Sequence, residues 1–105
     1  MKVLLLNGSA NKNGSTSIAL GEISKTLNQE GIETEIITTD AKPIRDCCGC
    51  KACKTNNTGR CIFGKDIVNE IINKAKECDG FIFGTPVYYA HPSGRILSIL
   101  DRVFY

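Results

Sequence analysis

The chain has 105 residues, which is enough for one domain with one hydrophobic core and too few for two. Hydrophobic residues make up 42% and charged residues 23%, a composition that indicates a globular protein and excludes a disordered one. The formal charge of +2 comes from scattered Lys and Arg residues without a basic stripe, so nucleic-acid binding is not indicated.

The N-terminal segment MKVLLLNGSA looks like a signal peptide only superficially. Its apolar run, Val3–Leu6, stops after four residues, whereas the hydrophobic region of a signal peptide needs about 7–15. A short apolar run ended by Asn-Gly is instead typical of a strand covered on both faces. Because no export signal is present and the apolar runs are too short to span a membrane, we expect a cytoplasmic protein with reduced thiols.

Strand and helix patterns alternate along the rest of the chain. In the first helical segment Leu20, Ile23 and Leu27 recur at helical spacing, and Gly31 can end the helix. The sequence predicts strands at 2–8, 32–39 and 80–86 and helices at 15–31, 65–78 and 92–105. This order predicts an α/β fold with a parallel sheet and helices on both of its faces.

The loop after the first strand, NGSANKNGSTS at residues 7–17, is a candidate phosphate site. In open parallel sheets the ligand lies beyond the carboxyl ends of the strands. The loop lacks the dinucleotide and P-loop fingerprints, but its hydroxyls and small residues lead into a helix N-terminus that favours anions. The alternative is a polar loop that only caps the helix.

The loop after the third strand, GTPVYYAHPSG at residues 84–94, would lie at the same edge of the sheet. Pro86 stiffens the exit from the strand, and Tyr88 and Tyr89 offer flat surfaces on which an aromatic ring system can lie. The alternative is two tyrosines that pack against the sheet edge.

Residues 46–61, DCCGCKACKTNNTGRC, hold five of the six cysteines and are predicted to form a long loop. The spacing is Cys47-x2-Cys50-x2-Cys53-x7-Cys61, and three close cysteines with a distant fourth are typical of cubane iron–sulfur ligand sets. Zinc, which more often uses two separated pairs, stays open as an alternative, and disulfides are disfavoured in a reducing compartment.

The remaining two cysteines have other expected roles. Cys48 would be a neighbour of the metal ligands, and Cys78 a core residue of the helix at 65–78. Gly49 and Gly59 supply the backbone freedom that wrapping a cluster requires.

The two loops resemble those of the flavodoxin-like NADPH-dependent FMN reductases, and within them the iron–sulfur flavoproteins. KVLLLNGSANKNGST looks like their phosphate loop, of the form G-S-P-R-x-x-G-N-T, and GFIFGTPVYYAHPSGRILSILDR resembles the G-[ST]-P-x-Y-x stretch that holds the isoalloxazine ring. The resemblance runs along residues 1–105. It implies that residues 1–105 are the N-terminal portion of a flavodoxin-like FMN-binding domain, a three-layer sandwich truncated to about three parallel strands in the order 2-1-3.

The resemblance also implies FMN as the cofactor and NAD(P)H as the electron donor. The residues implied for the FMN phosphate are Ser9, Ser15 and Thr16, with Lys12 and Asn13 close by. Those implied for the ring are Thr85, Pro86, Val87, Tyr88 and Tyr89. Three residues depart from the pattern: Ala10 stands in place of its Pro, Asn11 in place of its Arg and Ser15 in place of its Asn. The loss of the Arg removes a phosphate contact worth about 1.5–3 kcal/mol, which Lys12 can partly replace.

For the cysteines, the resemblance implies a [4Fe-4S] cluster on Cys47, Cys50, Cys53 and Cys61. Similar flavin reductases also keep a G-C-x-x-C segment without any cluster. The implied function is an FMN-dependent oxidoreductase or electron-transfer flavoprotein that passes electrons between FMN and the cluster. The alternatives are a non-catalytic assembly module that no longer binds FMN stably and a zinc-binding structural domain.

The third strand raises a further expectation. Strands four and five of a flavodoxin-like sheet are absent, so GFIFGTP would become an edge although its composition is that of a central strand. We therefore expect a homo-oligomer, a dimer or tetramer, that works with NAD(P)H or a redox partner and with neither nucleic acid nor a membrane.

Overall fold

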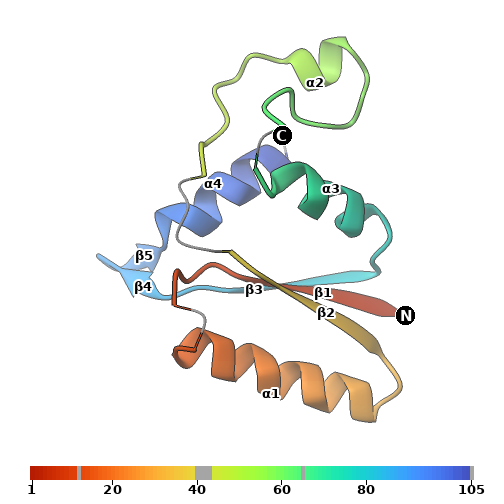
Figure 1. Ribbon diagram of the computed structural model, residues 1–105, viewed down its shortest axis with the longest axis vertical. Coiled ribbons are helices and arrows are strands. Elements are labelled where there is room, and N and C mark those ends of the chain that lie inside the picture. The colour runs from red at the N-terminus through yellow and green to blue at the C-terminus, as the bar shows by residue number, and fades with distance from the viewer. Residues whose placement is uncertain (12, 40–43, 65, 105) are drawn as a thin grey trace.

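The computed structural model describes residues 1–11, 13–39, 44–64 and 66–104. Three parallel strands form one sheet in the order β2-β1-β3, which confirms the predicted topology. These strands are β1 (Lys2–Asn7), β2 (Glu33–Thr38) and β3 (Gly80–Gly84). The helices are α1 (Ser15–Gln29), α2 (Ala52–Thr55), α3 (Val68–Lys76) and α4 (Gly94–Val103), and a small hairpin pairs β4 (Val87–Tyr88) with β5 (His91–Pro92) (Figure 1).

Strand β1 is the centre of the sheet. Its residues Leu4, Leu5 and Leu6 are fully buried, because β2 and β3 flank the strand and helices cover both of its faces. A parallel strand buried on both faces needs a continuous apolar run instead of alternation, which is why the pattern KVLLLN identified it from the sequence.

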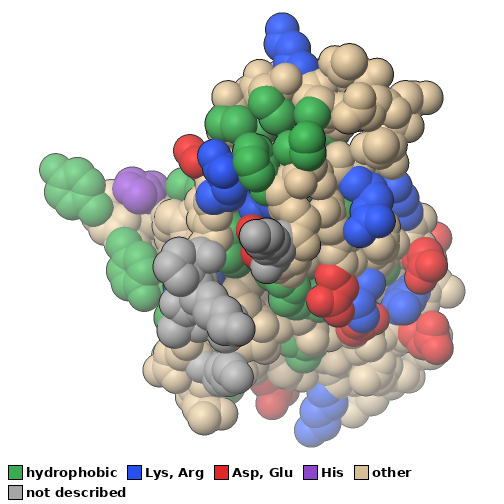
Figure 2. Space-filling model, turned by 45° about the horizontal axis from the view of Figure 1, so that its top comes forward, with side chains coloured by type: hydrophobic (Ala, Val, Ile, Leu, Met, Phe, Trp, Pro, Cys, Tyr) green, Lys and Arg blue, Asp and Glu red, His purple; other side chains and the backbone are tan. Residues whose placement is uncertain are grey.

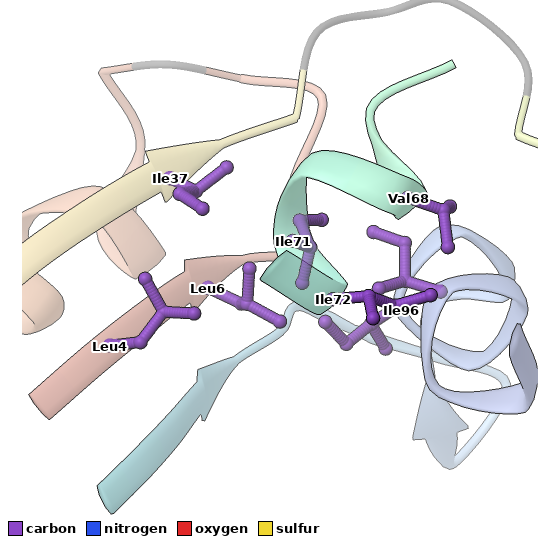
Figure 3. Packing of buried hydrophobic residues seen from close by; sticks show 8 residues of the cluster. Leu4, Leu6, Ile37, Val68, Ile71, Ile72 and Ile96 are labelled. Atoms are coloured by element: carbon purple, nitrogen blue, oxygen red, sulfur yellow. The ribbon is translucent and has the colours of Figure 1, made fainter. Parts of the chain in front are cut away.

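The helices divide between the two faces of the sheet (Figure 1). Helix α1 covers one face, where Leu20 packs with Val3 and Leu5. Helices α3 and α4 cover the other, where the larger cluster contains Leu4, Leu6, Ile37, Val68, Ile71, Ile72, Ile96 and Ile99 (Figure 3). The result is the expected three-layer α/β arrangement. Among the described residues, no helix combines the length and the apolar character needed to cross a membrane.

Several boundaries differ from the sequence prediction. The middle helix is shorter than the predicted 65–78, since α3 ends at Lys76, and Cys78 lies beyond it while packing against the larger core cluster. Residues 46–61, called the cysteine segment below, were predicted as a loop but contain the short helix α2. The hairpin was not predicted, because its turn residues Tyr89 and Ala90 have positive φ angles of 48° and 63°, where Gly or Asn is usual.

Two glycines allow the ends of β1 and β3 to meet. The Gly8 amide donates to the Gly84 carbonyl at 2.7 Å. A Cβ atom on Gly8 would lie 2.7 Å from Ile96 Cβ, and one on Gly84 would lie 2.9 Å from atoms of Leu20 and Thr16. Both positions therefore require glycine for a close approach of strand ends and helices.

We expect Gly8→Ala to lower the free energy of unfolding by about 1–3 kcal/mol, because the added methyl overlaps the Ile96 side chain. Urea denaturation followed by circular dichroism measures this. Gly21→Ala in α1 is the matched control: a Cβ there meets no atom within 4 Å, so this change should stabilise the chain by about 0.5–1 kcal/mol. Equal stability of the Gly8→Ala and unaltered chains would contradict the close approach.

Candidate functional site

The loop after β1 is shaped by a ladder of its own side chains. Asn7 Oδ1 accepts from the Ser9 amide at 2.9 Å, Ser9 Oγ from the Asn11 amide at 3.1 Å, and Asn11 Oδ1 from the Asn13 amide at 3.0 Å. Each bond joins a side chain to the backbone two residues on, a local pattern that replaces regular structure. The loop conformation thus follows from the Asn and Ser residues at alternate positions.

The end of this loop leaves hydrogen-bond donors available for an anion. Gly14 occupies the N-cap of α1 and has no side chain with which to cap the helix, and the first amides of any helix lack partners within it. Ser15 is exposed and Thr16 is half-buried in this first turn. Ser9 is buried, and because its Oγ accepts from Asn11, its hydroxyl hydrogen stays available as a donor. Lys12 lies outside the described residues.

Ser93 joins this loop to the loop after β3. Its amide donates to Thr85 Oγ1 at 2.9 Å, and its own Oγ donates to the Gly8 carbonyl at 2.8 Å. The same Oγ accepts from the Ile96 amide and so caps α4. The two predicted loops therefore lie side by side at the carboxyl edge of the sheet.

Neither Ser93 nor Asn7 is among the site residues predicted from the sequence. Ser93 carries a usable signal, because serine immediately before a helical pattern is typical of an N-cap. Asn7, at the end of an apolar run, is fully buried, and its side-chain amide nitrogen has no partner among the described residues. Burial of an amide directly beside the loop marks it as part of the candidate site.

The residues predicted to contact a ring divide into two groups. Thr85 and Pro86 are half-buried against the body of the protein, and Thr85 Oγ1 donates to the Pro86 carbonyl. Val87, Tyr88 and Tyr89 belong to the hairpin, which projects from the body and carries hydrophobic side chains into solvent (Figures 1 and 2). Tyr89 is 97% exposed, so it does not pack against the sheet edge.

The cysteine segment surrounds a cavity of about 200 Å³. The cysteines that line it are Cys47, Cys48, Cys50, Cys53 and Cys61. The cavity thus gathers all four predicted ligands, and every cysteine of the chain is a free thiol. Among the described residues, however, no three His, Cys, Asp or Glu side chains lie close enough together to hold a metal ion.

The chemistry of this cavity fits a soft metal centre. Four thiols are the donor set of iron–sulfur clusters and also suit zinc. Basic side chains, including Lys51, Arg60 and Arg102, line the same cavity and can offset the negative charge of thiolates. Left-handed backbone at Gly49 and Gly59 turns the segment around the cavity. Ligation would require the thiols to converge from their present positions.

Cys61 is hydrogen-bonded to two helices that pack on the sheet. Its amide donates to Asn69 Oδ1 at 2.8 Å, and Asn69 Nδ2 donates to its carbonyl at 2.9 Å. Its Sγ accepts from Arg102 Nε at 3.4 Å. Asn69 belongs to α3 and Arg102 to α4, so the two helices of one sheet face together fix the fourth cysteine.

The two candidate sites lie at opposite ends of α4. The cysteine segment follows β2 in the chain, but its described part lies beyond α3 and α4 from the sheet (Figure 1). Helix α4 begins beside Ser93 and ends near the cysteines, and its 10 residues span about 15 Å.

Comparison with known proteins places this arrangement in a family. Residues 1–105 match the family described as NADPH-dependent FMN reductase. An iron–sulfur flavoprotein of Methanocaldococcus jannaschii is 39% identical over 97% of this chain and 51% of its own length. An iron–sulfur flavoprotein of Archaeoglobus fulgidus is 33% identical over 97% of this chain and 48% of its own length.

A more distant relative extends the comparison to bacteria. An iron–sulfur flavoprotein of Clostridioides difficile is 32% identical over 97% of this chain and 45% of its own length. The chain therefore spans about half the length of the curated relatives it matches. No solved structure gives a significant match. From the match over its whole length, the chain belongs to the NADPH-dependent FMN reductase family, with a flavodoxin-like fold.

Proposed function

We propose that the chain forms part of a redox flavoprotein that binds FMN at the loops after β1 and β3 and a [4Fe-4S] cluster at the cysteine segment. The proposal rests on the hydrogen bonds that hold the two loops together at the carboxyl edge of the sheet. Gly8 bonds to Gly84, and Ser93 bonds to Gly8 and Thr85. Ligands of open α/β sheets bind at this edge. Family membership supports an FMN-dependent flavoprotein.

The residues of the first loop suit a phosphate. Ser9, Ser15 and Thr16 would donate their hydroxyl hydrogens to phosphate oxygens, and the uncapped first turn of α1 would add backbone amides. Thr85 and Pro86 would position the isoalloxazine ring, and the exposed Tyr88 and Tyr89 would shield it from water. FMN, once bound, supplies one-electron and two-electron chemistry. NAD(P)H is the electron donor that the family description suggests.

At the second site, Cys47, Cys50, Cys53 and Cys61 would hold the cluster. The names of the relatives as iron–sulfur flavoproteins and the gathering of these thiols around one cavity support this assignment. A reducing compartment such as the cytoplasm would keep the thiols available. The length of α4 between the sites means that electrons would have to cross the helix layer or pass to a neighbouring subunit.

We also propose a homo-oligomer, for which the exposed edge of the sheet is the support. β3 has no partner on its outer side among the described residues. Phe81 and Phe83 of β3 form an aromatic cluster with Phe104, with ring centroids 5.1–6.3 Å apart. Phe83 and Phe104 are exposed. An unprotected strand edge with exposed aromatic rings favours association.

We expect FMN to bind more tightly than FAD or NAD, and the double variant Ser9→Ala, Thr16→Ala to weaken FMN binding by about 3–6 kcal/mol, from two hydrogen bonds to a charged group. Titration followed by quenching of flavin fluorescence measures this. The control Ser98→Ala removes a hydroxyl of α4 that, among the described residues, donates to the Gly94 carbonyl of its own helix, and it should leave binding unchanged. Tighter binding of FAD or NAD would refute the assignment.

We expect anaerobic reconstitution with iron and sulfide to load one cluster per chain. Cys53→Ala should abolish loading because it removes a ligand, whereas Cys48→Ala, which removes a neighbouring thiol of the same cavity, should leave it intact. Iron and sulfide analysis with visible absorption gives the result. Binding of zinc without iron would instead support the zinc-binding structural domain.

We expect Phe83→Lys to shift the chain toward monomer in analytical ultracentrifugation at micromolar concentration, since it places a charge at the proposed interface. The matched control is Ile18→Lys, which changes an exposed residue of α1 on the opposite face of the sheet and should leave the oligomer intact. A stable monomer of the unaltered chain would contradict the proposal. An oligomer that binds no flavin would favour the non-catalytic assembly module.

A further inference from the structure

Arg102 is a charged residue at a core position of α4. The buried residues of this helix are Ile96, Ile99 and Arg102, spaced by three, so Arg102 continues the apolar stripe that faces α3 and the sheet. Only 5% of the residue is exposed. Arginine is almost never buried to this degree unless its charge and its donors are used.

The guanidinium makes contacts on all sides. Nη1 and Nη2 both bond to the Asp66 carboxylate, Nη2 donates to the Phe63 carbonyl, and Nη1 donates to the Arg45 carbonyl at 3.2 Å. Nε donates to Cys61 Sγ at 3.4 Å. An arginine guanidinium is not deprotonated in proteins, and the Asp66 carboxylate pairs with this one. The side chain thus stays charged.

The stability of the fold does not require an arginine here. Replacing a buried ion pair by apolar side chains of similar volume is often neutral or stabilising, and the neighbours along the stripe are isoleucines. Every described partner of Arg102 lies between Arg45 and Asp66, in or beside the cysteine segment. Its contacts therefore serve that segment and not the packing of α4 on the sheet.

The other cations of the cavity differ from Arg102 in exposure. Lys51, Lys54 and Arg60 also line the cavity but are exposed, so water and salt screen their charges. Arg102 is enclosed, and its charge acts on Cys61 through a lower dielectric. It also aims a hydrogen-bond donor directly at the sulfur.

We propose that Arg102 is a positioning residue for the fourth cysteine: it holds the Cys61 sulfur at the cavity wall and raises the reduction potential of the cluster bound there. Asn69 fixes the Cys61 backbone, and Arg102 fixes its sulfur. Hydrogen bonds to cluster sulfurs and nearby positive charge favour the reduced state, which carries one more negative charge. This inference rests on the proposed cluster at the cysteine segment.

Three variants of the full chain, reconstituted anaerobically, test it by redox titration followed by visible absorption and electron paramagnetic resonance. Arg102→Gln removes the charge and should shift the midpoint potential to more negative values. Arg102→Lys keeps the charge without the fork of donors, so its potential should lie between those of Arg102→Gln and the unaltered chain.

Asp66→Asn is the matched control for a purely structural role. It weakens the same ion pair and should lower the thermal midpoint as Arg102→Gln does, but it removes the negative charge that offsets Arg102. Its potential should therefore shift to more positive values. We expect Arg102→Gln and Asp66→Asn both to be less stable but to shift the potential in opposite directions. A loss of structure alone would not shift the two potentials in opposite directions.

The outcomes distinguish this inference from the proposed function. If Arg102→Gln does not fold, the positive shift in Asp66→Asn and the negative shift in Arg102→Lys carry the test. Unchanged potentials, or shifts of the same sign in the Arg102 variants and Asp66→Asn, would overturn the role of Arg102 while leaving the cluster in place. An unaltered chain that takes up no iron would overturn the cluster assignment and the role of Arg102 with it.

Discussion

Burial of β1 on both faces is the constraint from which the remaining structure follows. Leu4, Leu5 and Leu6 expose no surface, so the fold must supply a helix layer above and below them. Parallel pairing of β1 with β2 and β3 requires each crossover to pass over a face of the sheet. The same pairing brings the carboxyl ends of all three strands to one edge. The need to bury β1 on both faces therefore determines the edge of the sheet at which the polar loops meet.

The edge of the sheet is held together by backbone groups and one serine. Gly8 and Gly84 let two strand ends approach more closely than any side chain would allow, and Ser93 bonds to both loops while it caps α4. A site built in this way owes its position to the packed core, even though its residues lie in loops. The projecting hairpin is the exception, since Tyr88 and Tyr89 gain little from packing and their exposed surface is available to a ligand or partner.

The cysteine segment is held by hydrogen bonds to α3 and α4 and not by the packed core of the sheet. Its described part contributes few apolar contacts to the core, and polar anchors from α3 and α4 hold it instead. Segments that cannot bury enough apolar surface often depend on a metal for their final structure, because binding energy then contributes to folding. Arg102 and Asn69 hold one cysteine in place, and the other thiols stand around the cavity without a common centre. Such a segment is suited to close around a cluster.

The sequence by itself determined the fold class, because apolar run length and helical periodicity are local properties that survive in any environment. It also identified the two loops, since glycines, hydroxyls and a proline after buried strands have local signals, and it grouped the cysteines by spacing. It missed the hairpin, because Tyr89 and Ala90 adopt left-handed backbone that their side chains disfavour and that only the surrounding structure can impose. The tertiary structure alone decided the roles of Ser93 and Arg102. Ser93 lies 85 residues from Gly8, and Arg102 lies 41 residues from Cys61, and contacts over such separations arise only when the sheet has brought the helices together.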